Sequence, residues 1–157
     1  MKKKHIFIYL TIFIFSGIIL RLSVSKNDVP SDCYGQLTQN YGKKKLAVLI
    51  TLEFLQKNKT GKLNVSGNYQ DENGLNLYIS RQVSFNYEEI NNKLIATSES
   101  VSIKPNDTMD NTWLGLFFAD FLMRENRGIV LDNYQTINGD IVYLSDGIPA
   151  LYCNKMH

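Results

Sequence analysis

The chain has 157 residues and a formal net charge of +2, a length with room for one domain and an anchor. The charge is uneven: residues 1–26 hold five basic residues and no acidic one, which leaves 12 basic against 15 acidic residues in the rest. That remainder lacks the basic excess of nucleic-acid-binding domains, so we expect no direct contact with nucleic acid. Its run of three lysines, at residues 43–45, is interpreted as a solvated strand end.

The N-terminal segment, residues 1–26, is predicted to be a cytoplasmic tip and a transmembrane anchor. Lysines at residues 2–4 precede a nearly continuous apolar run over residues 6–20. Counted through Val24, a helix rising about 1.5 Å per residue spans roughly 28 Å, close to the thickness of the hydrocarbon core. Because basic flanking residues stay cytoplasmic, we expect a single-pass inner-membrane protein whose remaining chain is periplasmic.

A cleaved signal peptide is the alternative for this segment, since its basic and apolar regions would look the same. Ser23-Val24-Ser25 is the best cleavage candidate, with small residues at both key positions. Against cleavage, Arg21 stands where a signal peptide has a short neutral region, and the segment contains no Ala-x-Ala. The uncleaved anchor is therefore favoured.

Residues 27–32 are predicted to be a polar linker, and residues 33–157 a single periplasmic β-rich domain. Its two cysteines, Cys33 and Cys153, lie near the two ends of that domain. In an oxidising compartment such a pair is expected to form a disulfide, which contributes up to roughly 5 kcal/mol in the chain-entropy model. The alternative is two unrelated free thiols. Two remote cysteines are too few ligands for a metal site.

The domain shows mostly alternating strand patterns separated by turn residues. We expect a mainly β fold, in which an antiparallel sheet of about seven strands is curved or barrel-like and carries one packed helix. Phase changes inside two of the longer segments indicate β-bulges. The segments interpreted as strands are residues 34–41, 45–56, 63–70, 75–87, 93–104, 129–137, 140–146 and 150–153.

One segment, residues 110–127, has helical spacing instead. Asp107 or Asp110 can cap its start and Gly128 can end it. Its apolar residues cover more than one face, whereas a helix packed on a sheet needs only a stripe. The surplus is either ordinary core or a surface for a partner, a membrane or a ligand. The candidate residues for that surface are Trp113, Leu116, Phe117, Phe118 and Phe121.

No catalytic constellation is visible in the sequence. The two histidines, His5 and His157, lie at the start of the anchor and at the end of the chain, so the domain lacks the commonest general base and metal ligand. Glu88 and Glu89 are adjacent on a predicted strand and would point to opposite faces. We therefore expect a protein that is not an enzyme and that uses no cofactor.

Several segments together resemble a known family. They are the N-terminal helix, Cys-Tyr-Gly at 33–35, Tyr-Ile-Ser-Arg at 78–81, Val-Ser-Phe-Asn-Tyr at 83–87, Leu-Phe-Phe-Ala-Asp-Phe-Leu at 116–122 and Gly-Ile-Pro-Ala-Leu-Tyr-Cys at 147–153. Over nearly its whole length the chain is similar to the FidL-like family of enterobacterial inner-membrane proteins. That resemblance implies a partner, a ToxR-like transmembrane transcription regulator, for which the chain would be a ToxS-type accessory subunit.

Two functional hypotheses follow. In the leading one, the periplasmic domain binds and stabilises a ToxR-like membrane regulator, together with a small apolar effector. In the alternative, it is a stand-alone, lipocalin-like periplasmic binder of apolar ligands, and its Phe-rich segment lines or plugs the cavity.

Overall fold

The computed structural model describes residues 32–156 of the chain. The predicted anchor, residues 1–26, and all but the last residue of the predicted linker lie outside these residues. Within the described part, no helix is both long and apolar enough to span a bilayer.

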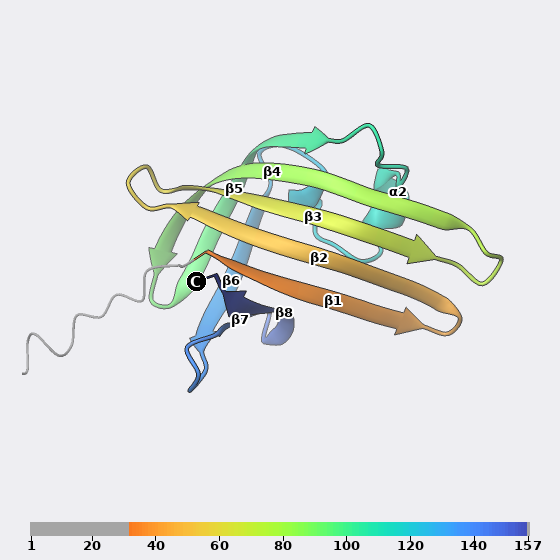
Figure 1. Cartoon of the computed structure of the whole chain (residues 1–157). Helices are drawn as coiled ribbons and strands as arrows, with labels where there is room; N and C mark the ends of the chain where they lie inside the picture. Colours follow the sequence, from red (N-terminus) through yellow and green to blue (C-terminus); the bar gives the residue numbers. More distant parts are fainter. Residues whose placement is uncertain (1–31, 157) are drawn as a thin grey trace, which may run out of the picture.

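Eight antiparallel strands close into a barrel, and their order around the barrel is their order in the chain. The strands are β1 (Cys33–Tyr41), β2 (Lys44–Leu55), β3 (Thr60–Gln70), β4 (Asn76–Ile90), β5 (Lys93–Ile103), β6 (Gly128–Gln135), β7 (Ile141–Ser145) and β8 (Ile148–Lys155). Figure 1 shows the first four as long, gently curved neighbours, with β6 passing behind them and β8 lying below β1. The expectation of a barrel-like antiparallel sheet is confirmed, with eight strands rather than about seven.

Alternation along each strand divides the barrel interior from its surface. In β2 every second residue from Leu46 to Phe54 is buried, and the residues between them are exposed or half-buried. Successive side chains of a strand point to opposite faces, so this series forms one wall of the core. Its position between β1 and β3 confirms the central strand that the apolar alternation predicts.

The irregularity predicted in residues 93–104 is present. The one predicted in residues 75–87 is not, because the buried alternation of β4 continues unbroken from Ile79 to Tyr87. The pairing of β4 with β5 shifts register between Ser84 and Phe85, because Ser84 pairs with Ser100 whereas Phe85 pairs with Ser98. The extra residue in β5 is Glu99. A bulge of this kind bends a strand and increases its twist, which helps a sheet to close.

The barrel closes where the first strand meets the last. Cys33 and Cys153 form a disulfide across this seam, with their α-carbons 5.4 Å apart, so the predicted disulfide is confirmed. The two strands pair over two residue positions only, at Cys33 and Tyr34 of β1. At Gly35 an added β-carbon would collide with the carbonyl oxygen of Tyr152, so glycine permits this close approach. Beyond it, residues 36–41 pair with β2 alone among the described strands.

The predicted helix over residues 110–127 is wrong. The structure has one helical turn, α2 (Asn111–Leu114), and a short 3-10 turn, η1 (Asp120–Leu122), joined by irregular chain. Asp110 caps α2 by accepting hydrogen bonds from the backbone N–H groups of Thr112 and Trp113, as predicted. A straight helix would leave part of this all-round apolar segment in water. The broken path instead turns Leu114, Phe121 and Leu122 into the core.

Candidate ligand-binding cavity

The barrel interior contains a partly open cavity of about 280 Å³, here called the inner cavity. Each of the eight strands contributes to its wall, and the segment over residues 117–122 covers it. None of the lining side chains carries a charge, and most are aliphatic or aromatic. They are Leu37, Gln39, Ile50, Leu52, Leu63, Phe85, Leu94, Ala96, Phe117, Phe118, Ala119, Phe121, Leu122, Ile129, Leu131, Tyr143, Ser145, Ala150 and Leu151.

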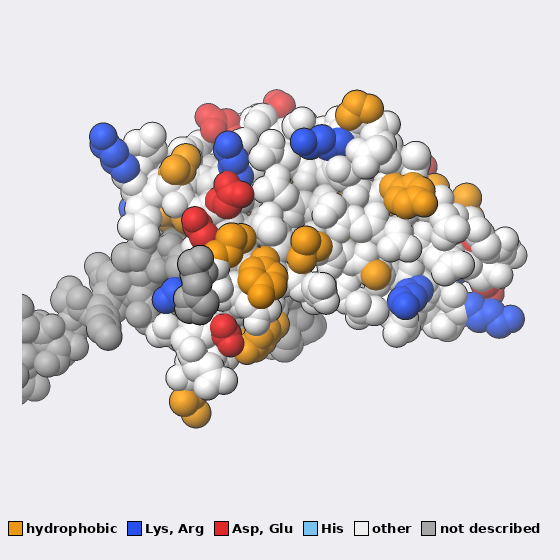
Figure 2. Space-filling model, viewed as in Figure 1, with side chains coloured by type: hydrophobic (Ala, Val, Ile, Leu, Met, Phe, Trp, Pro, Cys, Tyr) orange, Lys and Arg blue, Asp and Glu red, His pale blue; other side chains and the backbone are white. Residues whose placement is uncertain are grey.

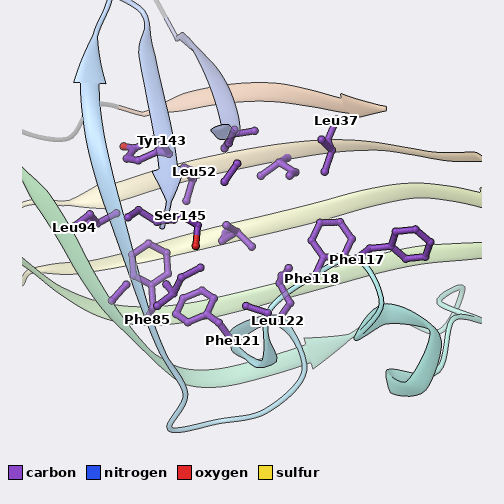
Figure 3. Close-up of a pocket in the computed structure, with 18 of the residues that line it drawn as sticks. Leu37, Leu52, Phe85, Leu94, Phe117, Phe118, Phe121, Leu122, Tyr143 and Ser145 are labelled. Atoms are coloured by element: carbon purple, nitrogen blue, oxygen red, sulfur yellow. The ribbon is translucent and has the colours of Figure 1, made fainter. Parts of the chain in front are cut away.

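The inner cavity is elongated. Figure 3 places Tyr143 and Leu94 toward one end and Leu37 and Phe117 toward the other, with Phe118 lying along the stretch between them. The lining side chains extend along the length of the long strands, between them and the covering segment. The shape therefore suits a narrow chain better than a compact globular molecule.

The covering segment is held upstream by a buried ion pair. Arg81 is in the inward-facing series of β4, and its Nε lies 2.9 Å from Oδ2 of Asp107, with the two side chains 2% and 1% exposed. The same carboxylate accepts the backbone N–H groups of Ser80 and Met109. The guanidinium also donates to Asn111 Oδ1, at 2.6 Å. Because both charges are hydrogen-bonded on several sides, the chain leading into α2 is fixed to β4.

A buried serine holds the segment downstream. The hydroxyl of Ser98 donates to the carbonyl oxygen of Arg124 at 2.7 Å and accepts from the N–H of Arg127 at 2.9 Å. The backbone of Ser98 also bonds to Asn126 and Arg127. The covering segment is thus anchored to neighbouring strands at both ends. Sequence reasoning missed both anchors, although an arginine in the inward phase of a strand was a visible signal for the first.

The inner cavity stays neutral at physiological pH. Tyr143 is buried at the end of the cavity opposite Phe117. Burial, followed by the charges of Glu89 and Tyr87, raises the pKa of the Tyr143 hydroxyl well above its ordinary value. Burial, and then Glu89, also raises the pKa of Tyr87. Burial disfavours the charged form of a phenol, so both hydroxyls remain protonated.

The five residues predicted as a partner or ligand surface lie in different environments. Phe117, Phe118 and Phe121 line the inner cavity, where Phe121 packs against Phe85 with ring centroids 5.8 Å apart. Trp113 is half-buried and packs against Tyr69 with the two rings tilted, their centroids 5.6 Å apart. Leu116, in contrast, is 68% exposed. The segment thus supplies the cover of a cavity as well as an exposed apolar side chain.

A second hollow, here called the outer pocket, adjoins the inner cavity. It is lined by Gln39, Asn40, Lys44, Tyr69, Leu116 and Phe117. Gln39 and Phe117 line both spaces, so these two side chains form the partition between them. Within residues 32–156 no group of three or more His, Cys, Asp or Glu side chains is placed to hold a metal ion.

Comparison with known proteins identifies the family of this domain. Residues 30–147 match the family model of the YqeJ C-terminal domain. No curated protein and no solved structure gave a match. None of these findings supports the FidL-like or ToxS-type resemblance. Because the family model covers more than half of the chain, the protein belongs to the YqeJ C-terminal domain family.

Proposed function

We propose that the barrel is a non-enzymatic binding domain that holds a small apolar molecule in the inner cavity. The observation that carries this proposal is an uncharged space of about 280 Å³ with walls from all eight strands. Small-molecule sites are typically concave, mostly apolar and roughly 300 Å³ or larger, so this cavity is near the lower end of that range. An apolar molecule of matching size gains about 25 cal/mol for each square ångström removed from water.

Filling the cavity tests this proposal. Leu37 lines the inner cavity, whereas its neighbour Thr38 is exposed on the outer face of β1. Leu37→Trp should block binding of a neutral fluorescent probe such as N-phenyl-naphthylamine, and Thr38→Trp should not. The full chain is used in lipid nanodiscs, with circular dichroism to confirm that both variants fold. Equal probe binding by the two variants would contradict an internal site.

The second candidate function is an accessory role. The N-terminal anchor in the inner membrane would hold the domain in the periplasm. There the domain would bind and stabilise a ToxR-like regulator, as the resemblance implies. Two observations favour a protein partner. Residues 36–41 of β1 offer a sheet edge that no other described strand pairs with. Leu116 adds an exposed apolar side chain on the covering segment. An open edge is a common site for strand addition by a partner.

The outer face near the seam adds to this surface. Figure 2 shows hydrophobic side chains gathered over the first part of β1 and the adjoining strand. Tyr34 of β1, Leu49 of β2 and Tyr152 of β8 are large hydrophobic residues exposed on these neighbouring strands. Exposed apolar patches on a small domain often mark interaction sites.

Membrane co-purification tests the accessory role. Leu116→Glu places a charge on the covering segment, and Leu55→Glu places one on a similarly exposed leucine at the end of β2. If a regulator docks here, Leu116→Glu should lose it while Leu55→Glu keeps it, with both variants folded. If Leu116→Glu still retains the regulator, Leu116 is not part of the interface.

A further inference from the structure

We infer that the molecule held by the barrel is a single-chain amphiphile with a negatively charged head group. Its tail lies along the inner cavity, and its head lies in the outer pocket beside Lys44. The inference rests on the proposed binding function and specifies the chemical class of the ligand.

The charge of the two spaces assigns tail and head. None of the residues lining the inner cavity is charged, so a charged group placed there would lose its hydration without a partner, at high cost. The outer pocket contains one charged residue, Lys44. A molecule that uses both spaces therefore buries an apolar tail and leaves a charged head at the lysine.

Lys44 differs from the two lysines beside it. It continues the inward series of β2, two residues before Leu46, whereas Lys43 and Lys45 are exposed and line neither space. Its Nζ lies 6.0 Å from the centroid of the Trp113 ring. No carboxylate of the described residues forms a salt bridge with it. The interpretation of residues 43–45 as a solvated strand end is therefore too simple for Lys44.

The neighbouring polar groups suit an anion. Gln39 and Asn40 also line the outer pocket, and their side-chain amides are hydrogen-bond donors. Tyr69 is in the same wall, packed beneath Trp113 and Phe117. Its buried hydroxyl has no hydrogen-bond partner among the described residues. A head-group oxygen that reaches between the two aromatic rings can accept from this hydroxyl and satisfy it.

The partition is the place where a bound chain would pass from one space to the other. Phe117 stands at the end of the inner cavity in Figure 3, and together with Gln39 it separates the two spaces. In the proposed complex the alkyl chain passes between these two side chains. A carboxylate at the end of that chain then lies within the outer pocket, close to Lys44.

Trp113 gives a direct readout, because it is the single tryptophan of the chain and lies at the head-group end. Decanoate brominated beside the carboxylate should quench its fluorescence more strongly than decanoate brominated at the far end of the chain. The full chain is used in nanodiscs of zwitterionic lipid. Brominated decanol of the same length, which has no charge, should bind about fivefold more weakly than the acid, as expected for a partly exposed ion pair.

Matched variants assign the effect to one lysine. Lys44→Gln should abolish the preference for acid over alcohol while the alcohol still binds, Lys44→Arg should keep the preference, and Lys45→Gln should change nothing. Equal affinity for acid and alcohol, or stronger quenching by the far-end bromine, overturns the head-group assignment and leaves an apolar ligand in place. Absence of saturable quenching by every probe overturns the proposed binding function as well.

Discussion

Arg81 and Asp107 form an ion pair inside the barrel, with Nε and Oδ2 2.9 Å apart. The arginine belongs to β4, and the aspartate belongs to the chain that leads from β5 into α2. The pair therefore fixes the start of the segment that covers the inner cavity.

Asp107→Asn should destabilise the domain strongly. The substitution leaves the Arg81 guanidinium buried without a counter-charge, and breaking a buried pair in this way typically costs about 3–5 kcal/mol. Denaturant unfolding measures the change. Asp132→Asn is the control. Its pair with Lys93 is far more exposed than the buried pair, so its loss should cost less than about 1 kcal/mol. Similar losses for both variants would contradict a special role for the buried pair.

Replacing Cys33 or Cys153 with serine should lower the free energy of unfolding by about 2–5 kcal/mol, as removal of a native disulfide commonly does in a small exported domain. Thiol labelling of the native protein should find neither cysteine free, as their disulfide requires. The double variant should lose no more than either single variant, because one bond is broken in each case. A single variant as stable as the parent would show that the seam holds without its covalent link.

Tyr143 should make the domain sensitive to alkali. Its pKa is raised in the folded state, mainly by burial, above the ordinary value of 10.0. The unfolded state therefore ionises first, so stability is complete below about pH 10 and falls as the pH rises above it. Tyr143→Phe should reduce this fall. Because the Tyr143 hydroxyl has no hydrogen-bond partner among the described residues, Tyr143→Phe should lower the free energy of unfolding only slightly at neutral pH. Denaturation midpoints measured across the alkaline range check both statements.

The topology prediction depends on the basic and apolar pattern of residues 1–26. A reporter fused after His157 should be active in the periplasm and inactive in the cytoplasm. The mature chain should keep Met1 and stay in the membrane pellet after salt washing. A soluble product that starts near Lys26 would instead favour the cleaved signal peptide.

Sequence patterns predicted the barrel well because strand alternation is a local property. The inward series of β2 and the two cysteines needed no knowledge of distant contacts. The helix prediction failed because residues 110–127 are apolar on every side. Their path depends on how these side chains pack against the barrel interior, which local spacing does not show. Spacing alone could not show that Asp107 meets Arg81 rather than capping a helix.

The candidate site was harder to predict than the fold. A cavity depends on how side chains from eight strands and the covering segment fill the interior, which no single stretch of sequence contains. One signal was present: Lys44 shares its phase with Leu46, Val48 and Ile50, so an inward lysine at the end of a core strand could have been recognised.

The short seam between β1 and β8 affects how the barrel is assembled. Every other strand pair joins neighbours in the chain, whereas β1 pairs with the last strand, β8. The disulfide across this pair joins cysteines that are 120 residues apart in the sequence. Local hairpins form quickly, and a contact of such long sequence separation forms late. During synthesis Cys33 therefore emerges well before Cys153, and its disulfide cannot form until the last strand follows. Oxidation at the seam then marks the completion of folding.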